Sequence, residues 1–264
     1  MELDLYVVDA FTQQQFSGNS AAVIPINEWL SDELMLSIAQ ENNLSETAFV
    51  KRLGQDHYAI RWFSPITEID FCGHATLASA YVLFNHFNTG HKLTFDTLAV
   101  GTLNVTQAED KLISMSFPNR APHPINQVPA ALLEGLSIKP DEIWLSPQAY
   151  FAIYHDEASV LNVLRNNENL KQLAPFDVVA TALSTNYDFI SRYFWPANGG
   201  DEDPVTGSIH AGLVPFWSER LNKTELIAYQ ASARGGILHC RLEEERVIVA
   251  GHAVLYLQGK INVS

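Results

Sequence analysis

The chain has 264 residues, of which 47% are hydrophobic and 17% charged, a composition typical of a folded, soluble protein with room for two domains. Its 16 Lys and Arg against 30 Asp and Glu give a net charge of −14, which repels nucleic-acid phosphates and anionic lipid headgroups. Composition and charge therefore argue against nucleic-acid and membrane-surface partners. An anionic small molecule can still bind where helix N-termini supply a local positive potential.

The cysteine content and the first residues bear on the cellular compartment. Cys72 and Cys240 are the two cysteines, and the opening MELDLYVVDAF lacks the basic and long apolar regions of a signal peptide. A reducing cytoplasm is therefore expected. The longest apolar stretch, residues 247–257, is too short and too interrupted to cross a bilayer as a helix, so no membrane partner is predicted.

The first half of the chain alternates between strand and helix patterns. Residues 31–44 carry apolar side chains at helical spacing, with Ser31 as a cap and Asn42-Asn43 as an end. A second helix begins within FCGHATLASA (residues 71–80) and is apolar on nearly all sides, which predicts a helix buried inside a sheet. Strands are predicted over residues 3–11, 20–26, 46–53, 57–65, 92–97, 101–107 and 111–118.

The second half repeats this plan after a Pro-rich connection, residues 118–129, which is the predicted domain boundary. The predicted domains are residues 1–118 and 119–264, with the final strand free to pack back on the first domain. Helices are predicted near residues 129–136, over residues 158–173 and from Gly207 to Arg220. Strands are predicted over residues 142–146, 150–155, 176–183, 188–196, 227–232, 236–242 and 246–261.

A short internal repeat relates the two halves. RWFSP (residues 61–65) precedes CGH at the start of one apolar helix, and RYFWP (residues 192–196) precedes TGS at the start of another. The repeat predicts duplicated domains related by a pseudo-two-fold axis. Two helix N-termini can then face one cleft and hold a carboxylate. The alternative is an ordinary strand end that occurs twice by chance.

Six longer segments follow one another along nearly the whole chain: VDAFT with FSGNSAAV, SETAFV, RWFSPITEIDFCGHATLASA, DEDPVTGSIHAGLVPFW and QASARGGILHCRL. Together they resemble the phenazine-biosynthesis isomerase family (PhzF-like), which is similar in fold to diaminopimelate epimerase. The resemblance implies an α/β (α+β) fold of two similar domains, each a curled and mostly antiparallel sheet around a central helix. It also implies an active site in the cleft between the domains, and catalysis without metal or organic cofactor.

The resemblance further implies the site residues. Glu46 matches the family's acid/base glutamate, and a carboxyl group whose pKa is raised by partial burial can remove a weakly acidic C–H proton. His74 and Asp203 match active-site positions, one from each domain. The substrate-binding positions are Asn19, Gly73, Gly207 and Ser208. From the residues alone, Glu46 can equally be a solvated strand-end residue and the glycines ordinary helix starts.

Cys72 stands where the related epimerases carry the first of two catalytic thiols. DPVTGS (residues 203–208) replaces the second thiol motif, so a two-thiol racemase is not expected. Cys72 is then either a residual nucleophile or a buried structural thiol. A zinc site from Cys72, His74 and Cys240 would need a further ligand, and no CxxC or HxxxH spacing supports one, so no metal is predicted.

The predicted function is a cofactor-independent isomerase of a small anionic substrate that carries a carboxylate. It resembles the family member that moves a proton on the ring of trans-2,3-dihydro-3-hydroxyanthranilate. The alternative is a non-catalytic small-ligand-binding or interaction protein on the same fold. Family members are often dimers, so a homodimer is compatible with the resemblance, but no exposed apolar stripe in the sequence identifies an interface.

Overall fold

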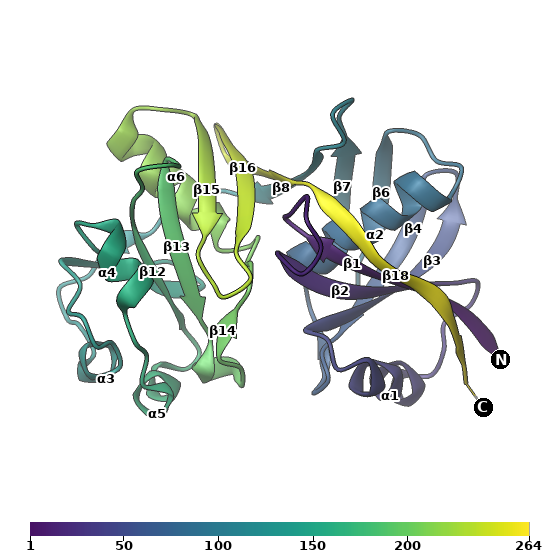
Figure 1. Ribbon diagram of the computed structural model, residues 1–264, viewed down its shortest axis with the longest axis horizontal. Helices are drawn as coiled ribbons and strands as arrows, with labels where there is room; N and C mark the ends of the chain where they lie inside the picture. The colour runs from purple at the N-terminus through teal and green to yellow at the C-terminus, as the bar shows by residue number, and fades with distance from the viewer. Residues whose placement is uncertain (264) are drawn as a thin grey trace. The chain divides into compact units, whose positions relative to one another are not determined.

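The computed structural model describes residues 1–263. The chain folds into two compact units (Figure 1), the first made of Met1–Ser116 with Ala250–Ser264 and the second of Phe117–Val249. Both units combine a mostly antiparallel sheet with a few helices, which is the α+β class expected from the sequence. Among the described residues, no helix is both long enough and apolar enough to cross a membrane.

The sheet of the first unit places strands from both ends of the chain side by side. Its order is β18-β1-β2-β3-β4-β6-β7-β8, with the short β5 paired to the end of β4. Neighbours are antiparallel except for the parallel pairs β2–β3 and β4–β6. The strands are β1 (Glu2–Ala10), β2 (Asn19–Ile26), β3 (Glu46–Gly54), β4 (His57–Phe63), β5 (Glu68–Ile69), β6 (Lys92–Asp96), β7 (Thr102–Gln107), β8 (Ile113–Pro118) and β18 (Ala253–Asn262).

Two helices complete the first unit. Helix α1 (Asp32–Asn42) begins where the Ser31 side chain accepts from the Leu34 N–H, and it ends at Asn43, which adopts the left-handed conformation. Helix α2 (Gly73–His86) has ten buried residues among its 14 and contacts β1, β2, β3, β7 and β18. The sheet therefore curls around α2, as Figure 1 shows, and this position explains why α2 is apolar on nearly all sides.

The second unit repeats the order and directions of the first seven strands of the first unit's sheet, from β18 to β7. The order is β9-β10-β11-β12-β13-β15-β16 with β14 on the end of β13, and the parallel pairs are β11–β12 and β13–β15. The strands are β9 (His123–Pro124), β10 (Glu142–Leu145), β11 (Ala149–Ile153), β12 (Asp177–Leu183), β13 (Phe189–Phe194), β14 (Glu202–Asp203), β15 (Glu225–Gln230), β16 (Gly236–Glu243) and β17 (Arg246–Gly251).

The helices of the second unit depart from the sequence-based expectation in two places. The α-helices are α3 (Ala130–Glu134), α4 (Glu157–Asn162), α5 (Asn167–Leu170) and α6 (His210–Leu221), and two short 3-10 helices are η1 (Lys171–Leu173) and η2 (Pro196–Asn198). One helix over residues 158–173 is wrong, because Val163 is extended and the Asn166 side chain caps a separate second helix. The helix expected from Gly207 starts three residues later, because Gly207 to Ile209 form a turn.

Helix α6 contains a proline without losing its hydrogen bonding. Pro215 has no N–H to donate to the carbonyl of Ala211, four residues earlier. The backbone N–H of Arg120 donates to that carbonyl instead, at 3.0 Å. The segment that enters the second unit thus supplies the hydrogen-bond donor that the proline cannot provide.

The RWFSP and RYFWP repeat corresponds to one structural arrangement that occurs in both units. Arg61 donates two hydrogen bonds to Glu68, both of 2.6 Å, and Arg192 donates two to Glu202, of 2.7 and 2.8 Å. The adjoining pairs are also in register, since Trp62 lies opposite Ile69 and Tyr193 opposite Asp203. The three extra residues of the second loop therefore lie between Phe194 and Glu202.

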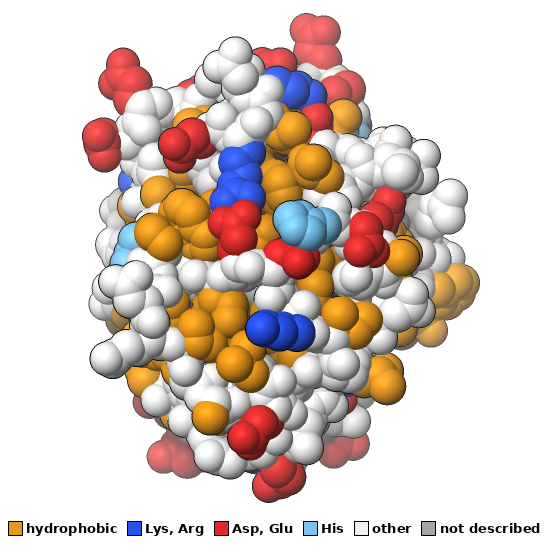
Figure 2. Space-filling view, turned by 90° about the vertical axis from the view of Figure 1, so that its left-hand side faces the viewer, with side chains coloured by type: hydrophobic (Ala, Val, Ile, Leu, Met, Phe, Trp, Pro, Cys, Tyr) orange, Lys and Arg blue, Asp and Glu red, His pale blue; other side chains and the backbone are white. Residues whose placement is uncertain are grey.

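The surplus of acidic residues is visible on the surface. Figure 2 shows Asp and Glu side chains scattered over one face of the protein, with few Lys and Arg among them. This distribution accords with the net charge of −14, which disfavours phosphate-rich partners.

Candidate active site

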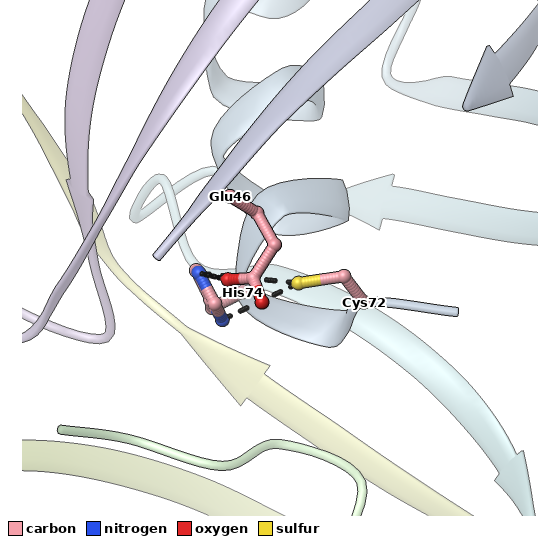
Figure 3. A group of neighbouring side chains, drawn as sticks. All are labelled: Glu46, Cys72 and His74. Carbon is pink, nitrogen blue, oxygen red and sulfur yellow. Dashed lines mark hydrogen bonds and ion pairs between the residues drawn. The ribbon is translucent and has the colours of Figure 1, made fainter. Parts of the chain in front are cut away.

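The first group of predicted site residues gathers at the start of β3 and the start of α2. Glu46 is the first residue of β3, and its side chain is 12% exposed. His74 is the second residue of α2, and its side chain is 6% exposed. Figure 3 shows both side chains pointing toward each other, with Cys72 beside them. The carboxylate oxygen Oε2 of Glu46 lies 2.9 Å from Nε2 of His74.

The other nitrogen of His74 faces an amide and a thiol. Asn19 Nδ2 lies 3.1 Å from His74 Nδ1, and Cys72 Sγ lies 3.4 Å from it. In the neutral imidazole Nδ1 accepts from the Asn19 amide nitrogen and Nε2 carries the proton toward Glu46, whereas in the imidazolium both ring nitrogens are donors and Nδ1 bonds the Asn19 amide oxygen once that amide turns over. Ser45, the neighbour of Glu46 in sequence, reaches the Asn19 carbonyl oxygen at 3.4 Å. Asn19 therefore holds the imidazole ring in the orientation that points Nε2 at Glu46.

The electrostatics favour an ion pair rather than a reactive thiolate. Burial, with a smaller contribution from the Glu46 charge, raises the pKa of Cys72 to about 11, so the thiol is neutral at pH 7. Burial by itself lowers the pKa of His74, but Cys72 and Glu46 together raise that pKa well above its usual value. Because a neutral thiol carries no charge, the Glu46 carboxylate is the group that stabilises the imidazolium at neutral pH.

The contact between Glu46 and His74 is short, but its angles are not those of a good hydrogen bond. Glu46 Oε2 is almost fully shielded from solvent, and among the described residues it receives no hydrogen bond of good geometry. The 2.9 Å ion pair thus holds the carboxylate without filling the lone pairs of Oε2. A carboxylate in this condition keeps the capacity to accept a proton from a bound molecule.

Glu46, Cys72 and His74 are also ligand types that zinc takes, and their ligand atoms lie within 4.8 Å of one another. Nε2 of His74 lies 2.9 Å from Glu46 Oε2 and 3.9 Å from Cys72 Sγ, while Nδ1 lies 3.4 Å from that sulfur. A closed structural zinc site needs a fourth protein ligand, and no further His, Cys, Asp or Glu among the described residues joins this group of three. Cys240, the other cysteine weighed for zinc, lies in β16 of the second unit with a pKa raised by burial.

The second group of predicted residues lies in the second unit, around the turn before α6. Asp203 is the last residue of β14 and accepts a 2.5 Å hydrogen bond from the Thr206 hydroxyl. The Gln230 side chain bonds both the Asp203 carbonyl oxygen and the Thr206 N–H, each at 2.8 Å. Gly207 and Ser208 follow in the turn, and the Ser208 hydroxyl oxygen accepts from Gln148 at 3.0 Å.

The sequence interpretation missed three residues of this second group: Gln148, Asp177 and Tyr193. Counting along the paired strands would have found one of them. Thr47 lies opposite Phe63 and Val178 opposite Phe194, so the residue before each, Glu46 or Asp177, holds the same place in its unit. The same count makes His74 and Ser208 equivalent, because each directly follows the glycine of the repeat.

Comparisons with known proteins extend over the whole chain. Residues 8–259 match the family described as Phenazine biosynthesis-like protein. An uncharacterized isomerase of Pseudomonas aeruginosa is 44% identical over 265 residues, covering 100% of both chains. A crystal structure of a PhzF-family phenazine biosynthesis protein from Enterococcus faecalis has a TM-score of 0.95 at 43% identity, and the match covers 100% of both chains.

A more distant structure shows the fold alone. A predicted epimerase from Pseudomonas aeruginosa has a TM-score of 0.77 at 19% identity, and the match covers 99% of this chain and 100% of that one. The epimerase-like fold and the family resemblance read from the sequence are both confirmed. With the family match spanning most of its length and curated relatives named as isomerases, the chain belongs to the phenazine biosynthesis-like (PhzF) family of isomerase-like proteins.

Proposed function

We propose that the protein is a cofactor-independent isomerase that moves a proton between two carbon atoms of a small substrate bearing a carboxylate. The observation that carries this proposal is the Glu46 carboxylate, which is 12% exposed and 2.9 Å from His74, and whose Oε2 receives no hydrogen bond of good geometry from residues 1–263. Partial burial, a fixed orientation and an unfilled acceptor are what a general base needs.

Glu46 removes a proton from a carbon next to a conjugated system, and the electron pair of the C–H bond moves into that system. The protonated carboxyl group then delivers the proton to another carbon of the same molecule, so no atom is gained or lost. His74 holds Glu46 in place through their ion pair, and Asn19 holds His74 through Nδ1. Cys72 takes no part as a base, because its thiol is neutral at pH 7.

The second part of the proposal concerns substrate binding. Asp203 contacts an amino or hydroxyl group of the substrate, while Gly73, Gly207 and Ser208 bind its carboxylate. Gly73 is the first residue of α2, where backbone N–H groups have no carbonyl of the preceding turn to bond. Glycine allows close approach to the backbone, and the Ser208 hydroxyl adds a donor.

The cytoplasmic setting and a homodimer belong to the same proposal. Both cysteines are free and buried, which suits a reducing compartment. Light scattering of the purified protein measures its oligomeric state directly.

The test is proton exchange with solvent. Wild type is incubated in deuterated water with trans-2,3-dihydro-3-hydroxyanthranilate and a panel of small cyclic or unsaturated carboxylates, and isomer formation and deuterium content are measured by NMR and mass spectrometry. We expect Glu46→Gln to slow both by roughly 10²–10⁴-fold, the usual contribution of a general base. Glu41→Gln, at an exposed glutamate of α1, is the matched control and should match wild type.

Two outcomes would contradict the proposal. Exchange that survives Glu46→Gln removes Glu46 from the shuttle role. Binding of members of the panel by wild type without any isomer or deuterium incorporation favours the second candidate, a ligand-binding protein that keeps the fold without turnover.

A further inference from the structure

A chain of buried polar side chains leads to Ser208 from the interior of the second unit. Gln148 Nε2 donates to the Ser208 hydroxyl oxygen at 3.0 Å and to the Tyr193 phenol oxygen at 2.9 Å. The Tyr193 hydroxyl donates to Asp177 at 2.6 Å, and Asn198 donates to the other oxygen of Asp177 at 2.7 Å. Tyr193 is 3% exposed and Asp177 is 9% exposed, so this chain is part of the protein interior.

Asp177 fixes which side chain donates and which accepts in each hydrogen bond of this series. Both oxygens of Asp177 accept, one from Tyr193 and one from Asn198, so Tyr193 spends its single hydroxyl hydrogen on Asp177 and its oxygen can only accept from Gln148. Turning the Gln148 amide over would place its carbonyl oxygen against the lone pairs of Tyr193. Burial raises the pKa of Tyr193 well above its usual value, so the phenol remains a donor.

The orientation of the Gln148 amide in turn determines the role of the Ser208 hydroxyl. Gln148 directs one N–H to Tyr193 and its other N–H to Ser208, so the Ser208 oxygen is an acceptor inside the protein. The hydroxyl hydrogen of Ser208 is therefore left to donate elsewhere. A hydroxyl held in this way suits an anionic group of a ligand, because donation to a charged acceptor makes a strong hydrogen bond.

We propose that Gln148 is a positioning residue that presents Ser208 as a hydrogen-bond donor to the substrate carboxylate, with its amide orientation set by Tyr193 and Asp177. The inference rests on the proposed function, in which Ser208 binds that carboxylate. It adds a specificity device that acts through Ser208 and touches no substrate itself.

The internal duplication supports this role. Asp177 holds the place in its strand that Glu46 holds in the first unit, and Ser208 holds the place of His74. In the first unit the acid contacts the residue after the glycine directly, at 2.9 Å. In the second unit the shorter aspartate acts on the equivalent residue through Tyr193 and Gln148. In both units, the acidic residue that begins the equivalent strand, Glu46 in β3 or Asp177 in β12, therefore orients the residue that follows the glycine.

The first test uses two fluorescent probes of the same shape, 2-aminobenzoate and its uncharged amide 2-aminobenzamide. Gln148→Glu replaces the donor by an acceptor of equal size, so Ser208 turns its hydrogen inward. We expect 2-aminobenzoate to bind roughly tenfold or more weakly to this variant, as for loss of a hydrogen bond to a charged group, with 2-aminobenzamide little changed. Gln172→Glu, at an exposed glutamine, is the matched control for the added charge.

A second variant separates positioning from folding. Gln148→Met keeps the volume of the side chain but forms no hydrogen bonds. Introduced into the wild-type protein, it should weaken 2-aminobenzoate binding; introduced into the Ser208→Ala variant, it should cause no further loss. Equal losses in both backgrounds at an unchanged Tm would overturn the inference, as would a Gln148→Glu variant that still distinguishes the acid from the amide as wild type does.

Neutron diffraction of the deuterium-exchanged protein decides the orientation without any ligand. We expect the Ser208 deuteron to point away from Gln148, and a deuteron between Ser208 and Gln148 would overturn the inference. Failure of wild type to exchange substrate protons would instead count against the isomerase proposal, so the two failures are distinguishable.

Discussion

At the scale of single residues, the chemistry of the first unit depends on which neighbour controls His74. The carboxylate of Glu46 lies 2.9 Å from one ring nitrogen, and the Cys72 sulfur lies 3.4 Å from the other. The thiol has a pKa of about 11 and stays neutral, so it cannot stabilise an imidazolium by charge at pH 7. In the proposed mechanism the histidine and the glutamate therefore act as a pair, and the neutral cysteine next to them takes no part.

This reading predicts how two substitutions change the pKa of His74. Glu46→Gln removes the charge that opposes burial, so the pKa of His74 should fall below its usual value. Cys72→Ser should leave that pKa close to its wild-type value, because replacing a neutral thiol removes no charge. NMR titration of the His74 ring measures both, and the reverse pattern would show that the thiol controls the ring.

Some of the residue-scale result was readable from the sequence and some was not. Glu46, His74 and Asn19 were predicted as site residues from family segments, and the structure places these three together in the first unit. Their mutual contacts come from β2, β3 and α2, and no local pattern gives the distance between side chains on different elements. The chain through Gln148 was missed for the same reason, because its members are 60 positions apart at the extremes.

At the scale of elements, two arginines fasten equivalent corners of the two units. Arg61 joins β4 to β5 through Glu68 and reaches Asp32 at the first turn of α1, 2.9 Å away. Arg192 joins β13 to β14 through Glu202, and it donates to the Val160, Leu161 and Val163 carbonyls at the end of α4. Both guanidinium side chains are 11% exposed, but Glu68 is 32% exposed whereas Glu202 is 13% exposed, so the Arg192 pair is the one largely removed from solvent.

We predict that Arg192→Met lowers the free energy of unfolding by about 2–3 kcal/mol, because the buried Glu202 carboxylate keeps, among the described residues, only its 3.1 Å bond from Arg165 and three carbonyls at the end of α4 lose a donor. Arg192→Lys should cost less, since it keeps the charge but not the forked geometry. Urea denaturation measures the change. Arg241→Met, at a half-exposed pair with Glu243, is the control and should cost less than about 1 kcal/mol; equal losses at both sites would contradict the role of Arg192.

At the scale of the whole molecule, the pH dependence of stability joins groups from both units. His210, the first residue of α6, is fully buried and donates through Nδ1 to the Thr206 carbonyl oxygen, while Nε2 has no partner among the described residues. Burial lowers the pKa of His210 to about 4. The unfolded chain therefore takes up a proton at this histidine below about pH 6.5, and the folded protein does not until about pH 4.

The contribution of His210 to stability should fall as the pH is lowered from about 6.5 to about 4, because the unfolded state binds more protons at this histidine there. The part due to His210 amounts to about 3 kcal/mol over that range. His210→Gln should be less stable at pH 7 but show a shallower slope between pH 6.5 and 4. Chemical denaturation at several pH values gives the slope of stability against pH for both proteins. His74 and Asp177 contribute with the opposite sign, but they are present in both proteins, so their contributions cancel in the comparison. Identical slopes would therefore refute the role of His210.

The sequence by itself determined the duplication, because this depends on local patterns: apolar helices after a glycine, alternating strands and the repeated Arg-aromatic-Phe corner. The resemblance of six segments to a known family indicated the α+β class, the family and the residues Glu46, His74 and Asp203. The tertiary structure decided what the sequence leaves open, namely that residues 158–173 form two separate α-helices, that Glu46 pairs with His74 beside a neutral thiol, and that Asp177 reaches Ser208 through two side chains. These outcomes depend on burial and on distances between remote segments, which exist only once the sheet has closed around its helix.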